Sequence, residues 1–303
     1  MSLTPYVARR PGRSRFVDVR GLRYHLTEWG DAALATPERP TLLMAHGWMD
    51  VGASFQFVID ALAEDRHIIA LDWRGFGLTD WPQADCYWFP DYLGDLDALL
   101  RHLDPPGPID LLGHSMGGNL ATMYAGIRAP RIRRLVNLEG FGLSPSQPEK
   151  APETYARWLD ELAAPARLRT YDSLAQVAQR LQQTNPLLPA DRAAWLAPHW
   201  ARERSDGQWE ILGDPAHKRR NPVQYQVKEV LACWQRITAP VLWAEGDRTD
   251  QHKRWNSNFT RADFEARLAV VAQFERHVLS PAGHMLHHDQ PQALAALLDR
   301  FLA

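Results

Sequence analysis

The sequence has few cysteines and little net charge, and each of these features excludes a class of protein. Only two of its 303 residues are cysteine, Cys86 and Cys233, and they lie far apart without the spacing of metal ligands. We therefore expect two reduced thiols and no disulfide framework. The net charge of −2 predicts no basic face for nucleic acid, so no nucleic-acid partner is expected.

Long apolar runs are also missing. No run approaches the ~18 apolar residues that cross a membrane, so we expect no membrane span. Residues 1–15 are polar and basic, without the apolar segment of a secretory signal, which predicts a cytoplasmic protein. The length suits one large α/β domain with an insertion, acting on a small-molecule substrate as a monomer or homodimer.

The most informative motif that is present reads Gly-His-Ser-Met-Gly at residues 113–117, directly after the apolar run at 109–112. A strand that leads into a sharp turn and then a helix holds the serine hydroxyl exposed at the carboxyl edge of a sheet. The flanking glycines permit that strained turn. We interpret Ser115 as a nucleophile.

A serine hydroxyl needs a histidine that takes its proton. His284 follows Gly283 after a strand-like run, and we assign it as this base. The nearby His287 and His288 are alternatives that we interpret as surface residues. Because these three histidines lack carboxylates at a useful spacing, we expect no metal site.

The histidine in turn needs an acid that fixes its tautomer and stabilises the imidazolium. In hydrolases with this motif the acid falls between serine and histidine in the chain. Asp247, after the apolar run at 241–244, is our assignment. Glu139, at the end of the preceding strand, stays open as the alternative acid, and Asp250 is also close.

Strand-like and helical segments alternate along most of the chain. Strand patterns fall at residues 16–29, 41–45, 67–71, 109–112 and 132–138, with helical patterns between them at 54–64, 92–103 and 116–128. This alternation predicts a parallel sheet with helices on both faces.

The alternation stops at residue 144 and resumes at Val241. Residues 144–236 are rich in proline, tryptophan and arginine, and they indicate helices with no convincing strand. We therefore divide the chain into an α/β core, residues 1–143 and 237–303, and an inserted helical cap, residues 144–236. We expect the cap to lie above Ser115.

Several motifs together resemble the α/β-hydrolase superfamily, in its capped branch. They are His46-Gly47-Trp48, residues 72–80, residues 113–118, Glu245-Gly246-Asp247 and Gly283-His284. The resemblance implies the α/β-hydrolase fold, with a mostly parallel eight-stranded sheet, and no cofactor. The stretch 46–50, with Ser54-Phe55 after it, looks most like serine-hydrolase-like members of the carboxylesterase type.

The resemblance also implies an oxyanion hole made by the backbone N–H groups of Trp48 and Met116. Met116 follows the nucleophile and starts a helix, so its N–H points at the developing charge. Pocket residues are expected beside this turn: His46, Asp50, Trp81 and Phe141. For His46, a structural role in bonding the loop backbone is favoured over that of a second base, and Asp50 should be hydrogen-bonded or partly exposed.

These features predict a serine hydrolase that cleaves a small to medium, largely apolar ester or lactone through an acyl-enzyme on Ser115. The 12 tryptophans favour an apolar pocket. Dehalogenases and epoxide hydrolases of this fold carry aspartate at the elbow, so the serine argues against them. Two alternatives stay open, a carbon–carbon hydrolase of a vinylogous diketone with the same triad and a catalytically silent ligand-binding receptor.

Overall fold

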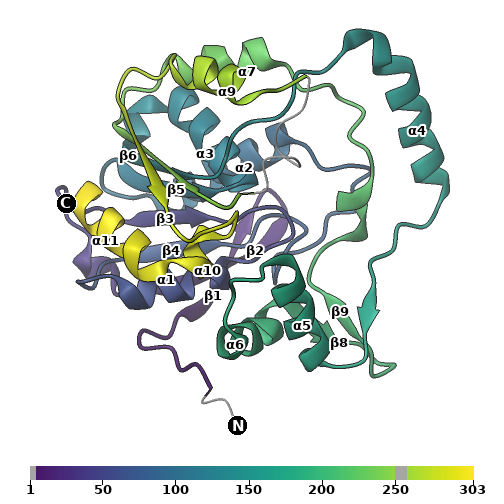
Figure 1. The fold of residues 1–303 in the computed structure, drawn as a ribbon, viewed down its shortest axis with the longest axis horizontal. Coiled ribbons are helices and arrows are strands. Elements are labelled where there is room, and N and C mark those ends of the chain that lie inside the picture. Colours follow the sequence, from purple (N-terminus) through teal and green to yellow (C-terminus); the bar gives the residue numbers. More distant parts are fainter. Residues whose placement is uncertain (1–4, 250–257) are drawn as a thin grey trace.

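An eight-stranded sheet runs through the centre of the molecule, as the resemblance implies (Figure 1). The computed structural model describes residues 5–249 and 258–303. In spatial order the strands are β1 (Arg13–Val19), β2 (Leu22–Trp29), β4 (Ile68–Leu71), β3 (Leu42–Ala45), β5 (Ile109–His114), β6 (Ile132–Leu138), β10 (Val241–Gly246) and β11 (Phe274–Leu279). Only β1–β2 and β2–β4 pair antiparallel, and the other neighbours pair in parallel.

The central strands are buried on both faces, which explains their continuous apolar sequences. Every residue of β3 and of β4 is buried. Leu42 and Met44 pack into one apolar cluster, whereas Leu43 and Ala45 pack into another, because successive strand side chains point to opposite faces.

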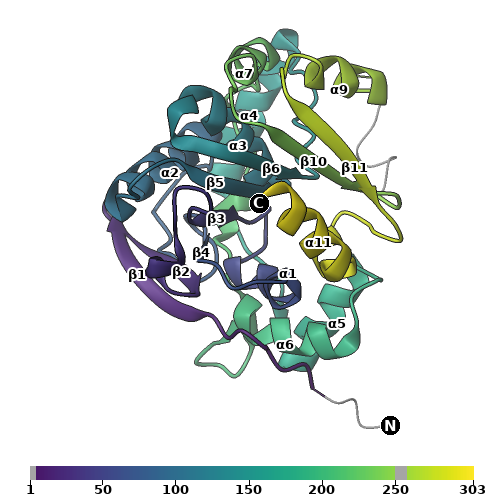
Figure 2. The same ribbon diagram turned by 90° about the vertical axis from the view of Figure 1, so that its left-hand side faces the viewer.

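Helices cover both faces of the sheet (Figure 2). One face carries α2 (Phe89–Leu103), α3 (Met116–Ile127), α7 (Val227–Trp234) and α9 (Arg261–Leu268), and the other carries α1 (Gln56–Ala61) and α11 (Pro291–Phe301). Short helices join these elements: η1 (Ala32–Leu34), η2 (Gly52–Phe55), η3 (Ala129–Arg131) and α10 (Leu286–Asp289). Within the described ranges, no helix is both long enough and apolar enough to cross a membrane.

The segment 144–236 contains η4 (Pro148–Lys150), α4 (Ala151–Ala163), α5 (Leu174–Thr184), α6 (Ala190–Trp200) and η5 (Pro215–Lys218). It also contains a small antiparallel sheet of β7 (Thr170–Tyr171), β9 (Trp209–Ile211) and β8 (Ala201–Glu203). The expectation that this segment has no strand is therefore wrong. The strands are two or three residues long, which is too short for an alternating pattern to stand out.

The last helix before β10 packs differently from the rest of this segment. Val230 and Trp234 of α7 are buried in the same apolar cluster as α3 and the sheet. In contrast, α4 has no buried residue and lies at the periphery (Figure 1). By packing, α7 belongs with the core layer, although the sequence pattern places it inside the cap.

Candidate active site

Ser115 stands at a tight turn between β5 and α3. Its backbone angles, φ 51° and ψ −112°, are ones that residues with a side chain rarely adopt. A Cβ at Gly113 would lie 2.2 Å from the carbonyl oxygen of Gly117, and a Cβ at Gly117 would lie 2.2 Å from that of Ala45. The glycines are therefore required by close backbone approach, and the strained turn expected from the motif is present.

His284 brings its imidazole against Ser115 from the loop between β11 and α10. Its Nε2 lies 2.9 Å from the Ser115 Oγ, and its Nδ1 lies 2.9 Å from Oε2 of Glu139. Because a carboxylate accepts but does not donate, Nδ1 carries the proton and the Nε2 lone pair faces the hydroxyl. In this arrangement the histidine can take the serine proton.

The acid beside His284 is Glu139, so the assignment of Asp247 to that position is wrong. Glu139 directly follows β6, with φ 61°, and its side chain is fully buried. Its Oε1 accepts hydrogen bonds from the N–H of Gly246 and the hydroxyl of Thr249, each at 2.7 Å. These bonds hold the carboxylate so that Oε2 faces the histidine.

Asp247 instead braces the loop that carries His284. Its Oδ2 accepts the hydroxyl of Ser280 at 2.6 Å, and its Oδ1 accepts the N–H of Ala282 at 2.9 Å. The hydrogen bond from Ser280, followed by that from Ala282, lowers the pKa of the exposed Asp247 carboxyl. The other nearby candidate, Asp250, lies outside the described residues.

Residues 40–291 match the family described as the alpha/beta hydrolase fold. The matched range covers most of the chain and includes the serine, histidine and glutamate of the site. The chain belongs to the α/β hydrolase fold family.

Several relatives carry hydrolase names. The chain is 25% identical to a serine hydrolase-like protein of Danio rerio over 211 residues, 67% of this chain but only 64% of that protein. It is 31% identical to the 3-hydroxybutyrate-oligomer hydrolase of Cupriavidus necator over 244 residues, 76% and 77% of the two chains. The solved thioesterase domain from the curacin biosynthetic pathway has a TM-score of 0.80 at 25% identity, covering 95% of this chain and 99% of that one. These similarities support a hydrolase of the α/β fold.

The segments expected to form the oxyanion hole of this hydrolase lie beside the nucleophile. Met116 is the first residue of α3, where a helix leaves its N–H groups without partners inside the helix. Trp48 follows Gly47, and a Cβ built on Gly47 would lie 3.2 Å from the Cβ of Ser115. Both segments therefore reach the serine, and donation by their N–H groups stays a prediction.

Two clefts meet at Ser115 and Trp48. The first, of about 480 Å³, reaches under α5 and α6 and has cations and amides in its wall: Arg169, Arg180, Lys218, Gln183 and Asn185. The second, of about 450 Å³, is mainly apolar, with Trp88, Phe89, Met123 and Val230 in its wall. Over the described part of the chain, none of the three cations forms an ion pair with a carboxylate. The sequence did not predict these cations, because nothing in the local pattern shows which side chains of residues 144–236 line the cleft at Ser115.

The pocket residues predicted from the sequence are only partly brought together. Asp50 lines the first cleft, and its Oδ1 accepts the indole N–H of Trp200 at 3.0 Å, as expected of a buried carboxylate. His46 has the structural role. Its Nε2 accepts the backbone N–H of Trp73 at 2.9 Å, and its Nδ1 donates to the carbonyl oxygen of Gly47 at 2.7 Å.

Trp81 and Phe141 lie away from both clefts, so their assignment to the pocket is wrong. Phe141 is buried in the core, where its ring packs against those of Trp243 and Phe264. Trp81 lines a separate hollow near Arg204. Both residues follow motifs at the carboxyl edge of the sheet, but neither side chain lines a cleft at Ser115.

His287 and His288 are buried, contrary to the expectation that they lie on the surface. The Nε2 of His288 lies 2.6 Å from the hydroxyl of Ser54. Burial lowers the pKa of His287 to about 4 and that of His288 to about 3. His114, before the nucleophile, is also buried, and burial lowers its pKa to about 3.

These buried histidines predict that acid destabilises the fold. Between the lowered values and the ordinary value of 6.5, the unfolded chain binds protons that the folded chain does not. The stability that these histidines contribute is therefore fully present above pH 6.5. It is lost as the pH falls toward the folded-state pKa of each histidine, about 4 for His287 and about 3 for His114 and His288. The loss in the free energy of unfolding is up to about 1.4 kcal/mol per pH unit for each histidine.

Thermal melting between about pH 7.5 and about pH 5 measures this loss. Replacing one buried histidine (His288→Gln) should flatten the dependence of stability on pH. The exposed His102, at the end of α2, is the matched control (His102→Gln) and should leave that dependence unchanged. A melting temperature that stays constant over this range would contradict the prediction.

Proposed function

We propose that the protein is a serine hydrolase that cleaves a carboxylic ester through an acyl-enzyme on Ser115. The observation that carries this proposal is the chain of contacts from the Ser115 hydroxyl through His284 to the buried Glu139. The names of the Danio rerio and Cupriavidus necator relatives support it.

In the proposed reaction the Ser115 Oγ attacks the acyl carbon while its proton passes to Nε2 of His284. Glu139 stabilises the resulting imidazolium through Nδ1. The N–H groups of Trp48 and Met116 bind the oxyanion, and one such donor contributes roughly 3 kcal/mol to the transition state. His284 then protonates the leaving alkoxide, and it later activates the water that releases the acid.

The two clefts support a substrate with two arms that meet at the scissile carbonyl. The apolar cleft suits a small to medium acyl or alkyl chain, because its volume lies in the range of small-molecule sites, roughly 300–1,000 Å³. Residues 144–236 act as a cap in this proposal, since α5 and the turn at Lys218 supply one wall of the other cleft.

Hydrolysis of nitrophenyl esters of increasing acyl length tests the proposal. We expect turnover that peaks at one chain length, because the apolar cleft has a limited volume, and labelling of Ser115 by a fluorophosphonate. Absence of both turnover and labelling would refute a serine hydrolase. Labelling without ester turnover would favour the carbon–carbon hydrolase or the silent receptor.

A second candidate function is hydrolysis of an oligoester of a hydroxy acid. The chain of such an oligoester ends in a carboxylate. The cations of the first cleft favour it, because Arg169, Arg180 and Lys218 have no carboxylate partner within the described residues. The Cupriavidus necator relative is named as a hydrolase of 3-hydroxybutyrate oligomers, which are esters of this class.

Removing the charge of Arg180, on α5, tests this second candidate. We expect Arg180→Gln to lower the preference for a carboxylate-bearing ester over its neutral methyl ester by about fivefold, the effect of a partly exposed ion pair. The ratio of the two kcat/KM values is the measurement. Arg157, an exposed arginine on α4 paired with Glu161, is the matched control. An unchanged ratio in Arg180→Gln would remove the support for an anionic substrate.

A further inference from the structure

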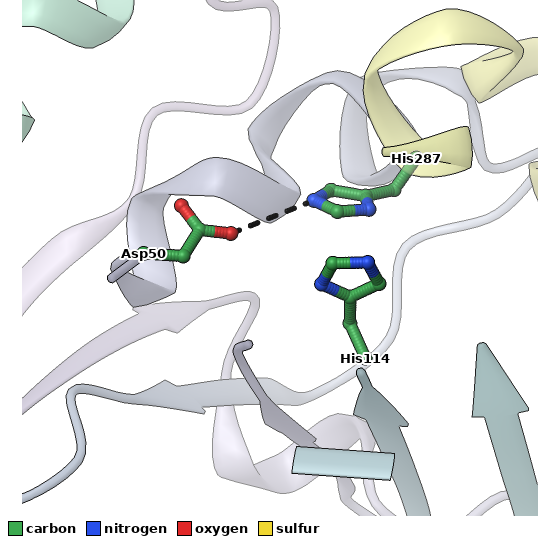
Figure 3. Close-up of side chains that lie close together, drawn as sticks. All are labelled: Asp50, His114 and His287. Atoms are coloured by element: carbon green, nitrogen blue, oxygen red, sulfur yellow. Dashed lines mark ion pairs between the residues drawn. The ribbon is translucent and has the colours of Figure 1, made fainter. Parts of the chain in front are cut away.

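Three buried side chains beside the Ser115–His284 pair place potential metal ligands close together (Figure 3). They are Asp50, from the turn after β3, His114, at the end of β5, and His287, from α10. One ligand atom from each lies within 4.8 Å of the others, and the three residues are only 3%, 1% and 0% exposed. The sequence could not predict this group, since Asp50 is far from both histidines along the chain.

Two buried polar atoms of this group, Oδ2 of Asp50 and Nδ1 of His114, have no hydrogen-bond partner among the described residues. The atom of His287 that faces Asp50 is Nε2, which also lies 3.5 Å from the hydroxyl of Ser54. An unpaired buried group costs about 1–3 kcal/mol. The Nε2 of His114 lies 2.8 Å from the carbonyl oxygen of His284, so Nε2 carries the proton and Nδ1 presents a lone pair. Oδ2 of Asp50 and Nδ1 of His114 therefore both offer an unshared electron pair, and a bound cation would accept them.

The surrounding contacts orient these ligands as they are oriented in metal sites. Ligating histidines commonly donate their second N–H to a carbonyl oxygen, and ligating carboxylates accept a further hydrogen bond. His114 donates to the carbonyl of His284, and Asp50 accepts from Trp200. Asp50 and His114 also line the first cleft, so the group lies against the wall of that cleft.

The ligand atoms lie farther apart than they would around a bound first-row ion, so binding requires the group to contract. Zn²⁺ binds nitrogen and oxygen at about 2.0–2.2 Å, which places its ligand atoms ~3.4 Å apart in a tetrahedral site. Oδ2 of Asp50 and Nε2 of His287 are 3.8 Å apart. Two imidazoles and one carboxylate, with a fourth position open, suit Zn²⁺ and its neighbours in the series.

We propose that Asp50, His114 and His287 bind one divalent first-row transition-metal ion, and that the bound ion inhibits hydrolysis. The inhibition rests on the proposed function. The rings of His114 and His284 are 4.9 Å apart between centroids, so a dication on His114 disfavours the imidazolium that His284 must form. Contraction around the ion also pulls on the His114 N–H that holds the carbonyl of His284.

Calorimetric titration of the full chain with Zn²⁺ tests the site without any activity. We expect one ion per chain in the wild type. Asp50→Asn and His287→Gln should each weaken binding at least about 100-fold, since changes in outer contacts alone cost about 10–100-fold. The control variant His102→Gln should bind like the wild type. Thermal melting shows whether each variant is folded. Either ligand variant tests the metal site by itself if it is folded, so failure of the other to fold leaves the test intact.

The site is overturned if the wild type binds no Zn²⁺, or if a folded Asp50→Asn or His287→Gln binds it unchanged. In the activity arm, Zn²⁺ should lower the kcat of ester hydrolysis at least about tenfold, a 1.4 kcal/mol effect that EDTA reverses. Binding without this loss refutes the inhibition. A protein that binds Zn²⁺ but hydrolyses no ester refutes the proposed function and leaves the metal site standing.

Discussion

Ser115→Ala is expected to abolish ester hydrolysis while the protein stays folded. In serine hydrolases, loss of the nucleophile lowers kcat by about 10⁶-fold, because the remaining groups only bind and polarise the ester. Alanine keeps the Cβ at the strained turn, where φ is 51°, and removes an oxygen whose partner is the Nε2 of His284. The free energy of unfolding should therefore change little.

The measurement is kcat on the best nitrophenyl ester, with melting temperature as the check on folding. The exposed Ser205, in the turn between β8 and β9, supplies the matched control, and Ser205→Ala should keep full activity. Activity retained by Ser115→Ala would remove the nucleophile from the mechanism, whatever the behaviour of the histidine.

Glu139→Gln is expected to lower kcat by about 10⁴-fold, the effect of replacing the acid that fixes the histidine tautomer. A neutral amide cannot stabilise the imidazolium at His284, and its NH₂ group can face Nδ1 and favour the wrong tautomer. Asp247→Asn is the matched comparison, because among the described residues this carboxylate accepts hydrogen bonds from Ser280 and Ala282 of the loop and none from His284. Asp247→Asn should lower kcat by less than about tenfold, because weakening an exposed contact has a small effect.

The two variants together separate the acid from the loop brace. Glu139→Gln should lower kcat with little change in KM, whereas Asp247→Asn should act mainly on melting temperature. A larger loss of kcat in Asp247→Asn than in Glu139→Gln would restore the assignment made from the order of the motifs, and it would refute the pairing of His284 with Glu139.

Local patterns were sufficient to predict the strained turn at Ser115 and most of the fold. The turn around Ser115 depends on residues adjacent in the chain, so the two glycines and the preceding apolar strand identify it directly. The buried strands β3 and β4 are apolar throughout, and β6 occupies the predicted range 132–138. The strands of residues 144–236 escaped prediction because pairing across the chain defines them.

The choice of acid shows where local reasoning stops. Strands β6 and β10 are neighbours in the sheet, so Glu139 and Asp247 reach the same edge. Both positions follow an apolar strand, and both suit a carboxylate. What separates them is the loop after each strand: Gly246 and Thr249 hold Glu139 toward His284, whereas Asp247 turns to the loop at Ser280.

By itself, the sequence determined the α/β hydrolase fold and the strained turn at Ser115, since strand and turn signals act over a few residues. Only the tertiary structure decided which acid meets His284, which cations line the cleft at Ser115, and that Asp50, His114 and His287 lie close together in the interior. Those contacts join segments that are far apart in the chain. Such segments come close together and become buried only when the sheet, its loops and residues 144–236 pack together.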